Sequence, residues 1–589
     1  MLVLLAVFLF FATWVALRAW FAKGELEHAQ ALVTALRDQV AAGEYEGIVE
    51  AYAEAQVHTS AARGFADDPV WRASEHVPLI GPNLRVLREL AVIVDDAMAL
   101  TEPLVSLAGE WDTAFAPQDG RIPLGTLREA AVDIPAAAEG FAALDERLDG
   151  VRTAGTLGQV SAARAQVADL VEKVSAALAD AAPIVSRLPA ILGGDGPRTY
   201  VVMFQNNAEL RSLGGGALYF AEVVVDDGAI SLSTVVPAGV QNFEHHDIAV
   251  GPVQPDFESV YPGSLGRFIA NVTVRPSSLG AAQIVAAEWS TTFGKDIDGV
   301  ISMDGGALQA LLGALDPITL STGDVVGSEN VMSLLLNEVY IRYNTGNNMA
   351  DNLSQNAVFT DTLTQTFSRL SSGQFDPATL ATSVADAAGA RHLSVWFADE
   401  GERDAVAKNP LGARDLPEST ATEDVIGVYL NDQVGSKLNY YLASTLTTGS
   451  AVCTPDGRQT RRLTLSLTST LPPEAVPGLS RSISGTQYSR LGLNKGDQQL
   501  VLFLYLPPGA RALSASVGGQ PVPLGPHSDS GHPVEVLWVT VPPGGTVEVS
   551  ADVLMAEPGE RVLVTEVTPT VTGTALVTAP LDCGTVALP

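Results

Sequence analysis

Positive charge is scarce in this 589-residue chain. It carries 34 lysines and arginines against 67 aspartates and glutamates, which gives a formal net charge of −33. Because the acidic residues are spread along the chain, a polyanion such as DNA or RNA would be repelled. We therefore expect no nucleic-acid partner.

Cysteine is nearly absent, and this limits the metal and redox chemistry open to the chain. The two cysteines, Cys453 and Cys583, have neither the spacing of a zinc site nor that of a redox motif. Two alternatives remain for them. They form one disulfide in an extracytoplasmic compartment, or they are separate thiols.

Charged residues of both signs make up only 17% of the chain, whereas hydrophobic residues make up 47%. That composition is typical of a folded protein and excludes a largely disordered one. Since one hydrophobic core rarely serves more than about 250–300 residues, a chain of this length predicts about three or four folding units.

The first 17 residues, MLVLLAVFLFFATWVAL, carry no charged side chain, and Arg18 follows them. This run predicts a single-pass membrane anchor within residues 1–23, with the bulk of the chain outside the cytoplasm. The alternative is a cleaved signal peptide. We favour the anchor because no charged segment precedes the run and no A-x-A-like cleavage site follows it.

Three regions follow the anchor. Residues 24–192 show apolar stripes at helical spacing and predict a helical stalk or bundle; the stripes comprise Leu32, Leu36 and Val40, and then Val167, Leu170, Val171, Val174 and Leu178. Residues 193–415 alternate strand-like and helical runs, which predicts an α/β or α+β domain. Residues 424–589 contain short strands separated by PPG turns, which predicts an immunoglobulin-like β-sandwich.

The stretch YVVMFQNNAELRSLGGGALYF, residues 200–220, places polar residues between two apolar runs typical of buried strands. A hairpin explains its glycines, since glycine adopts positive φ without strain. An arginine beside such a turn needs a carboxylate or an anionic ligand. We expect Glu209 to be the structural partner of Arg211. The alternatives are that Arg211 contacts a ligand, or that Glu209 acts as a general base.

Two other acidic or histidine-bearing motifs favour structural roles. Asp304 follows a strand-like run and precedes an apolar helix, which favours a helix cap over a ligand or a base. The adjacent residues His245 and His246 point to opposite faces of an extended segment, so we expect no metal site there.

Several segments together resemble one bacterial family. TYVVMFQNNAELRSLGG, IDGVISMDGGALQALLGALDPI, RHLSVWFADEGE and GVYLNDQVGSKLNYYL are similar to successive motifs of the domain-of-unknown-function family 4012. The phrases QNNAELR-x-x-GG and YLND-x-x-GSK are the most specific of these motifs. The resemblance implies a membrane-anchored, extracytoplasmic protein of the kind common in actinobacteria, with no assigned activity.

A fainter resemblance is to the LytR-CpsA-Psr phosphotransferases, which attach glycopolymers from a polyprenyl-pyrophosphate carrier to the cell wall. This resemblance implies that Arg211 and Arg342 hold pyrophosphate, because bidentate guanidinium groups stabilise phosphates. It places Asp351 and Gln355 close by. Without a ligand, an arginine and a carboxylate at this spacing are a surface pair.

Asn352 and Asn356 stand where the transferase resemblance would place arginine. Each missing charged hydrogen bond would weaken pyrophosphate binding by roughly 1.5–3 kcal/mol. Whether the chain is an enzyme, and whether it uses a cofactor, therefore stays open. We expect a cell-envelope protein that binds or transfers a cell-wall glycopolymer or its polyprenyl-pyrophosphate precursor. The alternatives are a non-catalytic scaffold that acts through the stalk and the sandwich, and a hydrolase that uses Glu209.

Overall fold

The computed structural model describes residues 2–42, 47–110, 116–254, 257–263, 265–586 and 588, without the side chains of residues 2–12 and 40–42. The protein is a multidomain α+β chain with a helical N-terminal region and several β-sheets. It forms two compact units. Unit 1 comprises Met1–Gly196 with Asp226–Ala229, and unit 2 comprises Pro197–Val225 with Ile230–Pro589.

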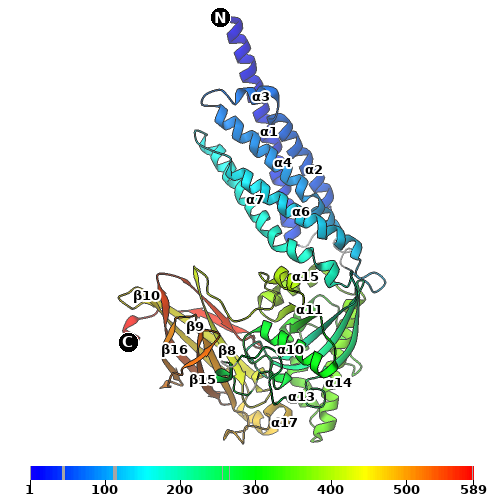
Figure 1. The fold of residues 1–589 in the computed structure, drawn as a ribbon, viewed down its shortest axis with the longest axis vertical. Helices are drawn as coiled ribbons and strands as arrows, with labels where there is room; N and C mark the ends of the chain where they lie inside the picture. The colour runs from blue at the N-terminus through cyan, green and yellow to red at the C-terminus, as the bar shows by residue number, and fades with distance from the viewer. Residues whose placement is uncertain are drawn as a thin grey trace. The chain divides into compact units, whose positions relative to one another are not determined.

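Unit 1 is a bundle of long helices (Figure 1). They are α1 (Leu2–Ala42), α2 (Ile48–Ala66), α3 (Pro69–Ser74), α4 (Gly81–Gly109), α6 (Leu124–Asp149), α7 (Gly158–Val185) and α8 (Leu188–Ile191). At the start of α3, Asp68 accepts a hydrogen bond from the Trp71 N–H at 2.7 Å and Pro69 occupies the first turn.

Two apolar clusters hold the bundle together. One lies between α1, α2 and α4, where Leu32 and Leu36 pack against buried Tyr52 and Ala55. The other lies between α4, α6 and α7 and buries residues of all three helices, among them Ile93, Phe141, Leu148, Val171 and Leu178. The predicted stripe on α7 is wrong at Leu170, which is half exposed, and Val40 lies outside the described side chains.

One described helical stretch, Gly158–Ile191, is long and apolar enough by length and composition to cross a membrane. In the structure its residues Val160, Val171 and Leu178 face the bundle core. The predicted anchor spans residues 1–23. Residue 1 and the side chains of residues 2–12, about half of that segment, lie outside the described part of the chain.

Unit 2 contains a central five-stranded sheet of order β3-β2-β1-β4-β7. Its strands are β1 (Arg198–Asn206), β2 (Gly216–Asp226), β3 (Ala229–Pro237), β4 (Gly299–Met303) and β7 (Leu393–Phe397). The strands β1 and β4 are parallel, whereas the β1–β2 and β4–β7 pairs are antiparallel, and the connection from β3 to β4 contains α10 (Ser278–Phe293). The alternation of strands and helices predicted for this region is confirmed.

Helices cover both faces of the central sheet. On one face α10 packs over Val201, Met203 and Val300. On the other face the ring of Tyr219 lies 5.4 Å from that of Phe359. The helices beyond β4 are α11 (Gly305–Gly313), α12 (Val331–Ser333), α13 (Val339–Arg342), α14 (Asn348–Ser371), α15 (Pro377–Gly389) and α16 (Glu400–Val406), with a π-helical turn at Leu334–Glu338.

The C-terminal part of unit 2 is built from two sheets of order β13-β12-β16-β10-β9-β18 and β14-β15-β11-β8-β17. The strands are β8 (Glu423–Asp432), β9 (Leu442–Val452), β10 (Arg458–Ser469), β11 (Gln498–Tyr505), β12 (Arg511–Val517), β13 (Gln520–Pro521), β14 (His527–Asp529), β15 (His532–Val541), β16 (Thr546–Pro558), β17 (Val562–Val567) and β18 (Thr574–Thr578). Their inward-facing leucines and valines form one core between the two sheets. The predicted strands in this region are confirmed.

The central sheet and the β-sheets of the C-terminal part share a second core. Val201 and Val300 of the central sheet belong to the same buried cluster as Tyr429, Phe503 and Tyr505 of β8 and β11. Burial of apolar side chains contributes roughly 25 cal/mol to the free energy of unfolding for each Å² of apolar surface removed from water. The two parts of unit 2 are therefore held together by packing.

Cys453 and Cys583 form a disulfide that closes a loop with a sequence separation of 130 residues. The bond ties the segment after β18 to the end of β9, beside which β18 runs parallel. Of the two alternatives left by the sequence, the structure has the paired one.

We expect the Cys453→Ser, Cys583→Ser double variant to be less stable because its unfolded chain gains conformational freedom. The loss in free energy of unfolding should be about 2–4 kcal/mol. A urea titration of the full chain, followed by near-UV circular dichroism, measures the shift in midpoint. Reducing the unchanged protein should reproduce the shift, and an unaltered midpoint in both experiments would contradict a stabilising role of the bond.

Candidate functional site

The loop between β1 and β2, residues 207–215, contains most of the QNNAELR segment, which spans residues 205–211. All its residues are buried except Glu209 and Arg211, which are half-buried. Asn207 has no exposed surface. Its Nδ2 donates to Asp304 Oδ2 at 2.7 Å, and its Oδ1 accepts from the Gly305 N–H at 2.9 Å. This asparagine therefore fixes the loop against the end of β4.

The glycines of this loop are required by close packing. Gly214 has a φ of 122°, and a Cβ at this position would lie 2.9 Å from Asp304 Oδ2. A Cβ on Gly215 would lie 2.2 Å from the backbone carbonyl of Asn206. Both positions exclude larger residues, so the prediction that the glycines serve the hairpin is confirmed.

The tip of the loop enters the core between the two C-terminal sheets. Leu210 is fully buried among the leucines of that core. Its N–H donates to Asn439 Oδ1 at 3.0 Å, and its carbonyl accepts from the Asp432 N–H at 2.9 Å. Beside it, Ser212 Oγ accepts from Asn431 Nδ2 at 2.8 Å. The two most specific motifs in the sequence, QNNAELR and YLND-x-x-GSK, therefore bind each other.

Glu209 and Arg211 have different partners from those expected. Glu209 forms an ion pair with Lys437, whose Nζ lies 4.6 Å from the centroid of the Tyr340 ring. Arg211 donates through Nη1 to the carbonyls of Leu210 at 2.8 Å and Asp432 at 3.2 Å. The expected Glu209–Arg211 ion pair is therefore wrong, because the YLND-x-x-GSK motif supplies a closer cation.

The ionisation of this pair follows from its surroundings. Burial alone would raise the pKa of Glu209, but Lys437 and, to a smaller extent, Arg211 outweigh burial and lower that pKa below its ordinary value. A carboxylate held ionised in this way is a poor proton acceptor near neutral pH. This argues against a role for Glu209 as a general base.

The remaining predicted residues organise the segment between α13 and α14. Arg342 donates to Asp324 Oδ2 at 2.6 Å. Asp351 accepts from the Thr345 hydroxyl at 2.7 Å and from its N–H at 3.1 Å, while Gln355 Nε2 donates to the Tyr343 carbonyl at 2.9 Å. Within the described chain, Arg211 and Arg342 share no hydrogen-bond or ion-pair partner.

The two adjacent histidines have separate environments. His246 Nε2 lies 3.0 Å from Glu288 Oε1, whereas the ring of His245 lies 4.3 Å from that of Phe268. Among the residues that the structure describes, no group of three or more His, Cys, Asp or Glu side chains could hold a metal ion.

A cleft of about 550 Å³ opens at the carboxyl ends of the parallel strands β1 and β4. Gln205 at the end of β1, Ser302 near the end of β4 and Ser394 on β7 line its floor. Ser302 and Ser394 are register partners, and Ser302 Oγ lies 2.7 Å from the side-chain amide of Gln205. The segment between 403 and 418 forms the opposite wall. Ligands of open α/β sheets bind at this edge.

One residue that lines this cleft, His392, contacts a buried aspartate behind it. His392 Nδ1 lies 2.8 Å from Asp304 Oδ2. The other carboxylate oxygen of Asp304 caps α11 by accepting from the N–H groups of Gly306 at 2.8 Å and Ala307 at 3.2 Å, which confirms the predicted cap. The imidazole packs on Gly306, where a Cβ would lie 2.6 Å from Nδ1.

The contact with Asp304 sets the charge of His392. Burial would lower the pKa of this histidine, but the carboxylate of Asp304 outweighs burial and raises the pKa above its ordinary value of 6.5. Since Nδ1 is taken by Asp304, Nε2 is the ring nitrogen for which no described residue supplies a partner. In its protonated form, His392 can therefore present a charged N–H donor to a ligand in the cleft.

The cleft walls carry both signs of charge. Arg391 has a φ of 66°, and its Nη1 lies 2.7 Å from Glu566 Oε2. The other charged wall residues are Arg403, Asp404, Arg414, Asp415 and Glu418. The indole N–H of Trp396, which also lines the cleft, is buried without a partner among the described residues. The arrangement suits a ligand that offers several hydrogen-bond acceptors.

Residues 195–340 match the model of the family described as protein of unknown function (DUF4012). The resemblance inferred from the sequence is thereby confirmed for this stretch. The match includes the β1–β2 loop and Asp304, and it ends before Arg342, Asp351, Gln355 and His392. No curated protein matches the chain.

Sequence reasoning missed the cleft and its histidine. His392 stands in RHLSVWF, a segment noted only for its family resemblance, and it is 88 residues from Asp304. The signal that could have found this contact is the pairing of β4 with β7, because Asp304 directly follows β4 and His392 directly precedes β7. That pairing is not visible in a single sequence, because strand neighbours across a helical crossover are set by tertiary packing.

We expect Leu210→Ala to destabilise unit 2 by about 2–5 kcal/mol, because it leaves a cavity where the loop enters the core. Leu576→Ala is the matched control, since Leu576 is 59% exposed. A urea titration monitored by tryptophan fluorescence compares the two midpoints. If the two variants lose equally little stability, the loop does not anchor the two parts of unit 2.

We expect the pKa of His392 to lie above 6.5 and to fall in Asp304→Asn, in which asparagine still caps α11. Histidine-selective NMR titration measures both values, with His392→Gln assigning the signal. Because the folded-state pKa is raised, the contribution of this group to stability is complete below pH 6.5 and is lost as the pH rises through the raised pKa. An equal pKa in both proteins would exclude coupling to Asp304.

Proposed function

We propose that this protein is a membrane-anchored, extracytoplasmic protein of the actinobacterial cell envelope. In this proposal unit 2 binds a cell-wall glycopolymer or its polyprenyl-pyrophosphate precursor. The observation that carries the proposal is the cleft at the carboxyl ends of β1 and β4, which is lined by His392, whose ring contacts buried Asp304. We further propose that the central sheet is of the LytR-CpsA-Psr type and that the C-terminal sheets form an immunoglobulin-like sandwich.

The lining of the cleft favours a sugar-containing ligand. Hydroxyl and amide groups of Gln205, Ser302 and Ser394 line its floor. Sugar hydroxyls accept and donate hydrogen bonds to groups of this kind. His392, with its raised pKa, adds a cation where a phosphate oxygen could bind.

This proposal places the ligand away from the pair of arginines that the transferase resemblance implies. Arg211 donates to two backbone carbonyls inside unit 2, and Arg342 is paired with Asp324. A pyrophosphate bound by both would have to displace these contacts. In the cleft, by contrast, Arg414 is exposed on the wall.

The proposed compartment has independent support. The disulfide between Cys453 and Cys583 is of a kind that persists in oxidising compartments and is rare in the cytoplasm. Together with the apolar run at residues 1–17, it supports an anchored chain whose bulk lies outside the cytoplasm.

A second candidate is a non-catalytic scaffold. The observation that favours it is the mutual binding of the QNNAELR and YLND-x-x-GSK segments, which assigns both motifs to holding unit 2 together. In a scaffold these motifs would hold the two parts of unit 2 in a fixed arrangement. Partner proteins would contact the helical bundle and the C-terminal sheets.

A binding experiment distinguishes the two functions. Isothermal titration of the full chain in detergent, with a short-chain polyprenyl-pyrophosphate glycan and with purified glycopolymer, should show binding of at least one of them. His392→Gln and Arg414→Glu should each weaken binding about tenfold, which is about 1.4 kcal/mol. Arg490→Glu is the matched charge reversal at an exposed site outside the cleft and should have no effect. Absence of binding to both ligands would reject the proposal and favour the scaffold.

A further inference from the structure

The segment between α3 and α4 exposes an unusual run of apolar side chains. Five consecutive residues, His76 to Ile80, are exposed, and four of them are apolar. Leu79 is 87% exposed and has a φ of 72°, a backbone conformation that few leucines adopt. Apolar runs of this kind on a protein surface mark a contact site.

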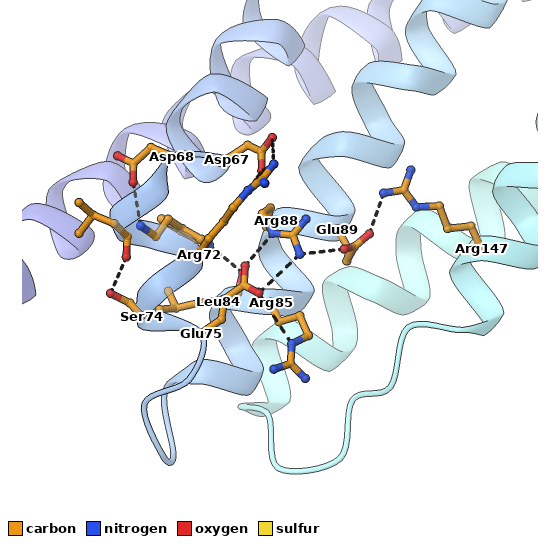
Figure 2. A network of polar contacts seen from close by, with 12 residues as sticks. Asp67, Asp68, Arg72, Ser74, Glu75, Leu84, Arg85, Arg88, Glu89 and Arg147 are labelled. Atoms are coloured by element: carbon orange, nitrogen blue, oxygen red, sulfur yellow. Dashed lines mark hydrogen bonds and ion pairs between the residues drawn. The ribbon is translucent and has the colours of Figure 1, made fainter.

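The base of this segment is fixed by polar contacts (Figure 2). Glu75 is buried, and its Oε1 accepts from Arg88 Nε at 2.6 Å, while Arg85 approaches its Oε2 at 3.8 Å. Arg88 also forms an ion pair with Glu89 at 3.0 Å. Gly81 packs against the backbone carbonyl of Glu75. A Cβ on Gly81 would lie 2.1 Å from that carbonyl oxygen. The exposed apolar residues therefore stand on a rigid base.

A second turn lies beside this segment. Asn83 donates through Nδ2 to the Leu79 carbonyl at 3.1 Å and accepts through Oδ1 from the Leu157 N–H at 2.7 Å. Leu157, in the turn between α6 and α7, is 64% exposed. We call residues 76–80 together with Leu157 the apolar tip of the bundle.

The apolar tip lies at the end of the bundle where the N-terminal apolar run leaves it. Val15 is buried against Trp71 and Leu84, next to the tip. Arg18 pairs with Asp68 at 2.8 Å, and the indole of Trp14 donates to the same carboxylate at 3.1 Å. Figure 1 shows α1 continuing past α3 beyond this end.

This arrangement fixes the depth of the tip relative to a bilayer. Arg18 is the first charged side chain after the apolar run, and exposed Trp14 and Trp20 flank it. Tryptophan and arginine at the end of a membrane helix lie at the headgroup level. Because Arg18 is bonded to the residues that precede α3, the apolar tip lies at that same level.

We propose that the apolar tip inserts into the interfacial layer of the lipid bilayer and thereby orients the bundle on the membrane. This inference rests on the membrane anchoring proposed above. The contact would add burial of four or five apolar side chains to the single anchor, and two attachment points restrict tilt where one does not. A protein partner is the alternative occupant that the experiment tests.

Site-specific fluorescence quenching tests the insertion. The two native cysteines are paired, so a single introduced cysteine can be labelled with bimane. Leu79→Cys, Val132→Cys and Leu5→Cys are made in the full chain, which is reconstituted into vesicles of phosphatidylglycerol and phosphatidylethanolamine that contain brominated lipids. Val132 is the control for the tip, because it is 68% exposed on α6.

We expect most of the fluorescence to be lost at positions 79 and 5 and little at 132. Quenching at position 5 without quenching at 79 would overturn the insertion of the tip but leave the anchor intact. A tip that is unquenched in vesicles would then be assigned to a protein partner. Absence of quenching at both 79 and 5 would overturn the anchor as well. Equal quenching at 79 and 132 would contradict a contact made by the tip alone. Ile80→Cys repeats the test at a second tip residue.

Discussion

The burial of Leu210 between the two C-terminal sheets joins the parts of unit 2, in addition to the core that the central sheet shares with β8 and β11. Leu210 belongs to a loop of the central sheet, yet its side chain is buried in the core of the C-terminal sheets. Side-chain amide oxygens accept from the backbone of this buried loop: Asn206 from the Ala208 N–H, Asn439 from the Leu210 N–H and Asn431 from the Ser212 N–H. Because this contact joins two parts of unit 2, it sets the geometry of every site built between their elements.

This constraint gives the most specific motifs of the sequence a structural role. A buried loop needs defined donors and acceptors at nearly every position, so its residue types are restricted as strongly as those of an active site. The same loop also contacts the carboxyl ends of β1 and β4, because Asn207 bonds to Asp304 and Gly305, and Leu213 lines the cleft. His392 and Asp304 occupy that edge.

Local features of the fold could be predicted from the sequence, and long-range ones could not. Apolar periodicity and proline placement located the bundle helices and the strands of both parts of unit 2. The cap by Asp304 followed from one strand and one helix. The partner of Glu209 is 228 residues away, and that of His392 is 88 residues away. Such partners depend on which strands and loops become neighbours, which a pattern in one sequence does not encode.

The disulfide between Cys453 and Cys583 also affects how the protein behaves among copies of itself. β18 is the edge strand that covers the backbone groups of β9, and only a short parallel ladder holds it. The bond fastens the residues that follow this strand to the end of its neighbour. In a reduced chain the strand could peel away and leave an open sheet edge, which is a template for strand addition by another molecule. Oxidation therefore protects the protein against self-association as well as against unfolding.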